Sequence, residues 1–241
     1  TEYYLREQMR TIQKELGDRE AGDIEEYRRK AKTLPLNDEA RDKVIWGRER
    51  KSAGYSQRER ETTAWHEAGH ALLQVLLPDT DPLHKVTIIP RGRALGATMA
   101  LPEKDVLNHT RKYFLAEMRL CCGGRIAEEV FTGDVSTGAA QDIAQATQIA
   151  REMICKYGMS EKFGFQAFME PSQFSNGDLP PAFSEETSRE IDAEVKRLID
   201  EAYADAKRVI DAHRDRLELL AKTLIEKETM DGREVEALVN G

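Results

Sequence analysis

The 241-residue chain has few of the features that mark membrane spans, disulfide-bonded domains or nucleic-acid-binding surfaces. Aromatic residues make up only 7% of it, and the formal net charge is −8. No apolar run reaches the about 20 residues that a membrane helix needs, and no signal-peptide pattern opens the sequence. We therefore expect no membrane span in this chain. We also expect no nucleic acid as its principal partner, because such partners select basic surfaces.

Cysteine is scarce as well, with 3 residues in the chain: Cys121, Cys122 and Cys155. Their spacing matches neither a metal-ligand motif nor a disulfide framework, which favours a reducing compartment. The adjacent pair falls in an apolar helical run, so buried packing is expected for both. We predict a cytoplasmic location, or the cytosolic or matrix face of a membrane if the chain is part of a larger protein.

Segments with a β pattern are also few. A β-branched run at 84–89, a turn at 90–92 and a second apolar run at 95–101 predict two strands. Helical patterns cover most of the remainder: about 105–122, 125–131, 139–157 and 184–238, the last broken near residue 215 and at 229–232. Two strands need a covering layer, so the predicted fold is mainly α with a small β-sheet.

The most informative pattern that is present is the pentad His66-Glu67-Ala68-Gly69-His70. Ser56 and Glu59 stand at capping-box spacing before it and Pro78 follows it, which predicts a single helix. Residues four apart on a helix lie on one face, so both imidazoles can bind one metal ion. Glu67 is then left free to act as a base on a water molecule. The pentad predicts zinc-assisted peptide hydrolysis.

A catalytic zinc site needs a third protein ligand, and spacing alone leaves several carboxylates open. Glu128 or Glu129, on a later helix, is in the usual place for such a ligand. Asp142 is the competing candidate, because the small-residue turn 136–141 leads into a helix with this aspartate in its first turn. Stabilisation of the helix dipole, worth at most about 1 kcal/mol, is the ordinary alternative for an acidic residue there.

Residues 1–44 differ in character from the rest of the chain. Leu5, Met9, Ile12 and Leu16 alternate spacings of four and three, which suits pairing with another helix. The segment has few large apolar residues and is not expected to form a core alone. A solvated helical linker and a helix for self-association or docking are both compatible with this pattern.

From about residue 46 to its end, the chain resembles the peptidase domain of the FtsH family of ATP-dependent zinc metalloproteases. Several stretches carry the resemblance in the same order along the sequence: 64–71 around the pentad, 84–92, Gly123-Gly124-Arg125-Ile126-Ala127-Glu128-Glu129, Ser136-Thr137-Gly138-Ala139-Ala140-Gln141-Asp142, and Tyr157-Gly158-Met159-Ser160. The resemblance implies a largely helical fold with a small sheet.

The same resemblance implies a set of roles. His66, His70 and Asp142 would be the Zn²⁺ ligands, and Glu67 the catalytic base. Glu128 and Glu129 become candidates for orienting a histidine through its other ring nitrogen. The strand near 95–101 would offer its open edge to an extended substrate, with these substrate-binding candidates: Gly96, Ala97 and Thr98.

Two further features bear on the organisation of the chain. It contains no Gly-x-x-x-x-Gly-Lys-Ser/Thr loop, so we expect no ATP binding by these residues. Residues 1–44 resemble the N-terminal helical region of Lon proteases, without the catalytic residues of that family. The predicted organisation is a Lon-like helical arm at 1–44 and an FtsH-like zinc metallopeptidase domain at 45–241.

The sequence therefore predicts a zinc-dependent endopeptidase that degrades unfolded or short polypeptides, as in protein quality control. Members of the resembled family assemble as hexamers, so we expect this chain to form a homo-oligomer, specifically a hexamer. The alternative is a non-catalytic oligomeric scaffold or binding module derived from such a peptidase. Retention of all the expected zinc-site residues favours the enzyme.

Overall fold

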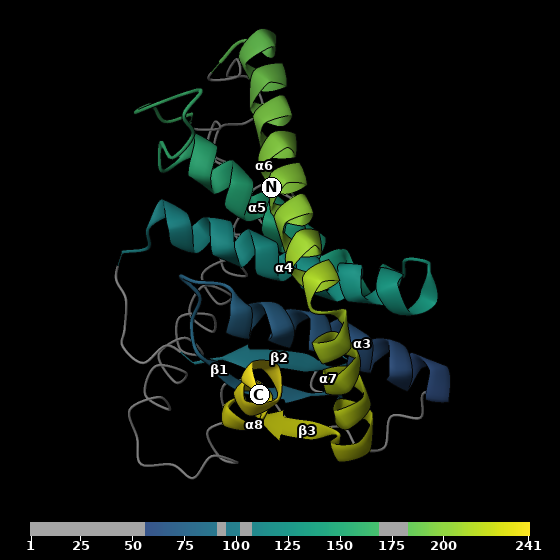
Figure 1. Ribbon diagram of the computed structural model, residues 1–241. Coiled ribbons are helices and arrows are strands. Elements are labelled where there is room, and N and C mark those ends of the chain that lie inside the picture. The colour runs from purple at the N-terminus through teal and green to yellow at the C-terminus, as the bar shows by residue number, and fades with distance from the viewer. Residues whose placement is uncertain (1–55, 91–94, 102–107, 169–182) are drawn as a thin grey trace, which may run out of the picture. The chain divides into compact units, whose positions relative to one another are not determined.

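The computed structural model describes residues 56–90, 95–101, 108–168 and 183–241 (Figure 1). The predicted arm at 1–44 lies outside these residues. The described helices and strands belong to one contact unit, Gly54–Ile89 with Leu95–Gly241. They form a mainly helical fold with a small antiparallel sheet, as the sequence predicts.

Helix α3 spans Gln57–Leu76 and carries the pentad. The predicted capping box is present, because the Ser56 side chain accepts from the Glu59 backbone and the Glu59 side chain accepts from the Ser56 backbone. This pairing satisfies two amide groups that a helix start would leave without partners. Leu72 and Leu73, on the inner faces of α3, are fully buried.

The sheet contains β1 (Leu83–Thr87), β2 (Ala97–Ala100) and β3 (Thr229–Asp231) in the order β2-β1-β3. Both pairings are antiparallel, with Val86 opposite Thr98 on one side and Met230 on the other. The first two strands confirm the prediction. The third was expected only as a break between helices, because a strand of three residues has no recognisable alternation of its own.

Helix α4 spans Arg111–Thr132 without interruption. The prediction of two helices, 105–122 and 125–131, was therefore wrong at the Gly123-Gly124 pair. Glycine lowers helix stability by up to about 1 kcal/mol per residue, but here both glycines lie against α3. The close contact between α3 and α4 accounts for the presence of the two glycines within α4.

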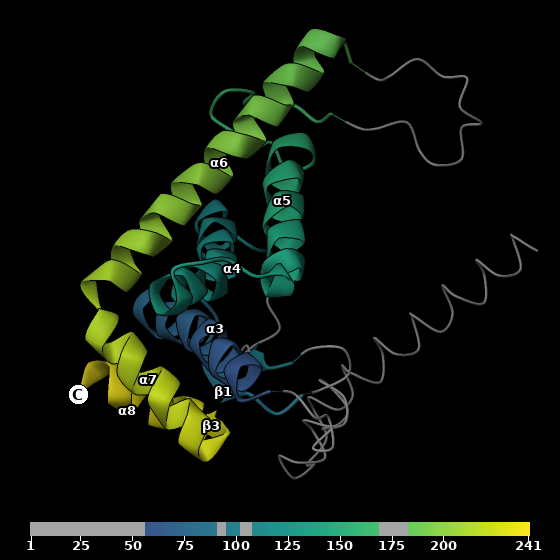
Figure 2. The same ribbon diagram turned by 90° about the vertical axis from the view of Figure 1, so that its right-hand side faces the viewer.

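The predicted helix at 139–157 consists of a 3₁₀ turn, η1 (Thr137–Ala139), and α5 (Ala140–Cys155). The C-terminal part forms α6 (Glu185–Ala212), α7 (Arg214–Lys227) and α8 (Gly232–Asn240). The break predicted near Asp215 occurs at His213, whose backbone leaves the helical region. Figure 2 shows α6 as the longest of these helices, with α5 beside it and α7 and α8 near the sheet.

The described residues bury two apolar clusters. One is formed by α3, the sheet, α7 and α8, and its large buried side chains include Leu72, Leu217, Leu220 and Leu224. The other lies between α4, α5 and α6 around Met118, Met153, Ile154 and Leu198. Helix α4 contributes to both clusters and so connects α3 with α5, the two helices that supply the candidate metal ligands.

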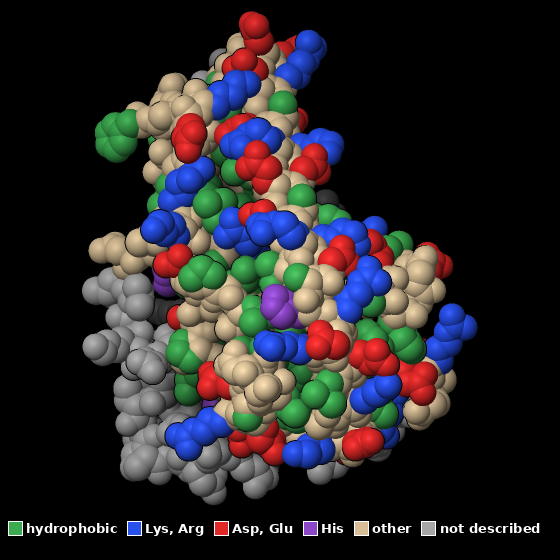
Figure 3. All heavy atoms as spheres, in the orientation of Figure 1, with side chains coloured by type: hydrophobic (Ala, Val, Ile, Leu, Met, Phe, Trp, Pro, Cys, Tyr) green, Lys and Arg blue, Asp and Glu red, His purple; other side chains and the backbone are tan. Residues whose placement is uncertain are grey.

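The described surface is rich in charged side chains of both signs. Figure 3 shows lysine and arginine side chains interspersed with aspartate and glutamate over the visible face. None of the helices that the structure describes is both long and apolar enough to cross a bilayer. The vicinal Cys121 and Cys122 are free thiols and buried, as expected from the apolar run.

Candidate metal centre

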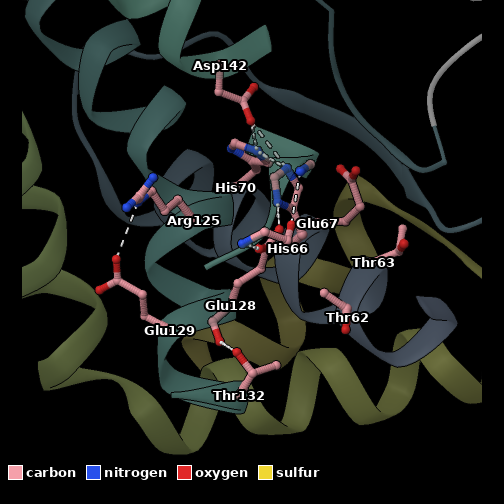
Figure 4. Close-up of polar contacts among 12 residues, drawn as sticks. Thr62, Thr63, His66, Glu67, His70, Arg125, Glu128, Glu129, Thr132 and Asp142 are labelled. Atoms are coloured by element: carbon pink, nitrogen blue, oxygen red, sulfur yellow. Dashed lines mark hydrogen bonds and ion pairs between the residues drawn. The ribbon is translucent and has the colours of Figure 1, made fainter. Parts of the chain in front are cut away.

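Helix α3 places His66 and His70 one turn apart, so their rings share one face. The two Nε2 atoms are 3.0 Å apart, and the ring centroids are 4.7 Å apart at an interplanar angle of 73°. Figure 4 shows both rings turned towards Asp142. The two nitrogens therefore converge on one point, as the spacing of the pentad predicts.

Helix α4 fixes the orientation of both rings through their other nitrogens. Nδ1 of His66 is 2.7 Å from Oε1 of Glu128, and Nδ1 of His70 is 2.8 Å from the backbone oxygen of Leu120. A carbonyl oxygen only accepts, so the His70 Nδ1–H is the donor and its Nε2 keeps a free lone pair. The second Glu128 oxygen accepts from the Ser136 backbone, and its side chain is 3% exposed.

Helix α5 brings Asp142 to the same point. Its Oδ2 is 3.3 Å from Nε2 of His66 and 3.5 Å from Nε2 of His70. Ligand atoms of a tetrahedral zinc ion with bonds of about 2.0–2.1 Å lie about 3.3 Å apart. The three atoms thus have the mutual spacing of zinc ligands. Among the described residues, this trio is the one group of three or more that could hold a metal ion.

The charges around this point also suit a cation. Burial alone would lower the pKa of His66, but hydrogen bonds with Asp142 and Glu128 outweigh burial and raise it to about 10. Burial would raise the pKa of Asp142, yet its contacts with the two histidines hold that pKa well below the usual range. Two imidazole nitrogens and a carboxylate in contact favour a positive charge between them, and a divalent cation would supply one.

Glycines make room for this arrangement. A Cβ atom on Gly124 would lie 2.4–2.6 Å from three atoms of the His66 ring, so only glycine admits the ring as it stands. A Cβ atom on Gly69 would lie 2.3 Å from the Gly123 backbone oxygen. The backbones of α3 and α4 therefore pass in direct contact beside the site.

The expected base, Glu67, lies next to the histidines and is 7% exposed (Figure 4). Its Oε2 accepts a hydrogen bond of 2.7 Å from the Thr98 hydroxyl on β2. Gly96 lies against the same carboxylate, because a Cβ atom there would be 2.8 Å from Oε1. Of the substrate-binding candidates, Ala97 and Thr98 both pair with β1 in the sheet. Thr98 also contacts Glu67, as does Gly96.

Glu129, the other glutamate candidate, lies apart from both histidine rings. Glu129 contacts the Tyr203 hydroxyl at 2.7 Å and Arg125 at 3.4 Å, and no histidine, so of the two glutamates only Glu128 orients a ring. His109, on which no expectation rested, stacks on Tyr113 and is not one of the three candidate ligands. The Leu120 carbonyl and the Thr98 hydroxyl were not anticipated in these roles, because neither belongs to a recognisable motif.

Comparison with known proteins finds matches over most of the chain. The sequence profile described as peptidase family M41 matches residues 53–238. The ATP-dependent zinc metalloprotease FtsH 2 of Methylacidiphilum infernorum is 52% identical over 209 residues, covering 85% of this chain and 33% of that protein. The ATP-dependent zinc metalloprotease FtsH of Protochlamydia amoebophila is 45% identical over 216 residues, covering 88% of this chain and 24% of that protein.

A third relative, the ATP-dependent zinc metalloprotease FtsH of Chlamydia trachomatis, is 46% identical over 206 residues, covering 84% of this chain and 23% of that protein. The chain thus spans about a quarter to a third of the length of these curated relatives. The comparisons do not support the expected likeness of residues 1–44 to Lon proteases.

Proposed function

The chain belongs to peptidase family M41, whose FtsH-type members are zinc metalloproteases, and we propose that it is a zinc endopeptidase domain acting on unfolded polypeptides. One observation carries the proposal. Nε2 of His66, Nε2 of His70 and Oδ2 of Asp142 converge at zinc-ligand spacing beside the Glu67 carboxylate. The first three residues are the proposed metal ligands, and Glu67 is the proposed base.

Zn²⁺ is the cofactor that the family membership implies, and the donor set fits it. When bound, it would supply Lewis-acid chemistry, making a water molecule more acidic and polarising the peptide carbonyl. Glu67 takes the proton from the attacking water and delivers it to the leaving amine. Glu128 and the Leu120 carbonyl hold the imidazoles in the tautomers that present Nε2.

The sheet supports the proposed substrate class. Strand β2 lies at the end of the order β2-β1-β3, and no strand of the described residues pairs with its outer edge. An extended peptide can add there by backbone hydrogen bonding, which selects for unfolded segments rather than for sequence. The matched relatives are named ATP-dependent proteases, so we further propose that the chain works beside an ATP-driven unfolding activity. Assembly as a homo-hexamer, and a location in the cytoplasm or at the cytosolic or matrix face of a membrane, stay predictions from the family resemblance.

The test is cleavage of a fluorescently labelled, permanently unfolded polypeptide without ATP. Wild-type chain with one zinc per chain should cleave it, and chelation should stop cleavage. Glu67→Gln should keep zinc and lose turnover, whereas His66→Ala should lose zinc as well. His109→Ala serves as the matched control, because His109 is exposed and is not one of the candidate ligands, so this variant should retain zinc and turnover.

Turnover by Glu67→Gln, or one tightly held zinc in His66→Ala, would refute the assigned roles. Zinc at one per chain without cleavage by the wild type would instead favour a non-catalytic binding module.

A further inference from the structure

We propose that Thr98 is a positioning residue for Glu67: its hydroxyl, carried by the edge strand, holds one carboxylate oxygen so that the other faces the substrate water. The inference rests on the proposed role of Glu67 as the base. It assigns the Thr98 side chain to the catalytic apparatus rather than to direct contact with substrate.

The contact itself has a defined direction. Oγ1 of Thr98 lies 2.7 Å from Oε2 of Glu67 and 3.2 Å from the Glu67 backbone oxygen. A threonine hydroxyl has a single proton, and both of these oxygens accept. The shorter distance and the charge of the carboxylate direct the hydroxyl proton of Thr98 towards Oε2, which makes this a charge-assisted hydrogen bond.

The carboxylate has few other constraints. Within the part of the chain that the structure describes, no second group donates a hydrogen bond to it. The last torsion of a glutamate side chain has a broad energy minimum, so helix α3 alone does not fix how the two oxygens point. Glu67 is buried, and solvent cannot readily replace a missing donor. The orientation of the base therefore depends on Thr98.

Gly96 supports the same conclusion from the other oxygen. A Cβ atom on Gly96 would lie 2.7 Å from Cγ and 2.8 Å from Oε1 of Glu67. Gly96 immediately precedes β2, and both it and the Thr98 hydroxyl lie against Glu67 of α3. The backbone just before the strand thus leaves space beside Oε1 at Gly96, while Thr98 holds Oε2.

This arrangement links the base to the substrate edge. Strand β2 pairs with β1 along one edge, with Thr98 opposite Val86, and its other edge is open among the described residues. A peptide added at the open edge takes its position from the β2 backbone. Because the same strand sets the Glu67 carboxylate through Thr98, the scissile bond and the base are aligned by one structural element.

The test compares Thr98→Val, which keeps the shape and removes the hydroxyl, with Thr98→Ser, which keeps the hydroxyl. Each is loaded with zinc and assayed on the unfolded polypeptide. Thr98→Val should bind one zinc per chain with unchanged KM, and kcat should fall about 10- to 100-fold because the base is misplaced. Thr98→Ser should keep most of the wild-type kcat, because its hydroxyl can still donate to Glu67. Thr223→Val removes a hydroxyl that donates only within α7 and should match the wild type.

Crystal structures of the two zinc-loaded Thr98 variants give a readout independent of turnover. The Glu67 carboxylate should leave its orientation in Thr98→Val and keep it in Thr98→Ser. An unmoved carboxylate in Thr98→Val, or a wild-type kcat in that variant while Glu67→Gln is inactive, would overturn this inference alone. Activity in Glu67→Gln would overturn the role of Glu67 and this inference with it.

Discussion

Replacing Gly124 by alanine should weaken zinc binding without unfolding the protein. The new Cβ atom would lie 2.4 Å from Cε1, 2.5 Å from Nε2 and 2.6 Å from Nδ1 of His66, where ordinary contacts are 3.4–4 Å. The imidazole must therefore recede by about 1 Å. Zinc–nitrogen bonds tolerate deviations of only about 0.2 Å, so the ring cannot move this far and remain a good ligand.

The energies indicate how the strain is relieved. Alanine is the better helix former by about 1 kcal/mol, so α4 itself gains from the change. Turning the His66 side chain away from its rotamer costs about 0.5–1.5 kcal/mol, and breaking its bond to Glu128 costs about 1.5–3 kcal/mol. Separating α3 from α4 would sacrifice the backbone contact of Gly69 with Gly123 and the packing around it. We expect the ring to move and zinc affinity to fall about 10- to 100-fold.

The assay is competition for zinc against a chromophoric chelator, with circular dichroism to confirm the helix content. Gly133→Ala is the control, since a Cβ atom there meets nothing within 4 Å and Gly133 ends the same helix. Its positive φ of 70° makes alanine costly in stability, by about 1 kcal/mol, but its zinc affinity should be that of the wild type. A folded Gly124→Ala protein with wild-type zinc affinity would refute the reasoning.

Three further changes test other parts of the site and its support. Glu128→Gln should weaken zinc binding about 10- to 100-fold by loosening His66, whereas Glu129→Gln should not, as chelator competition will show. Gly69→Ala should lower the free energy of unfolding by about 1–3 kcal/mol in urea, because its methyl group meets the α4 backbone. Hydrogen bonds, chiefly from Arg197 on the same helix α6, lower the pKa of Glu194 from 4.5 to about 2. The stabilisation of the folded state by this contact is present above about pH 4.5 and is lost as pH falls through about 2. Because the arginine is partly exposed, solvent screens the contact, and we expect it to contribute about 1–3 kcal/mol. Urea unfolding across this range should show a smaller decline in Glu194→Gln, and an equal decline would refute the assignment.

Features set by neighbours in the chain were predictable. The capping box, the helix over the pentad and the strands before and after Pro90 depend on spacings of a few residues, and the structure has them. Interpretations failed where a distant segment decides the outcome. Two glycines in succession ordinarily mark a helix break, but α4 continues through them because α3 lies against them. The three residues of β3 form a strand because β1 is available to pair with them.

The candidate site divides in the same way. The sequence by itself determined that His66 and His70 share a helix face with Glu67 between them, because helical geometry is local and repeats every 3.6 residues. Motif spacing left Asp142 and the two glutamates as equal candidates, and only resemblance to a family ranked them. The tertiary structure decided which groups surround the histidines: Asp142 from α5, Glu128 and the Leu120 carbonyl from α4, and Thr98 from β2 beside the base. Such contacts depend on how closely α3, α4 and β2 pack, and no periodicity within one segment encodes the distance to another.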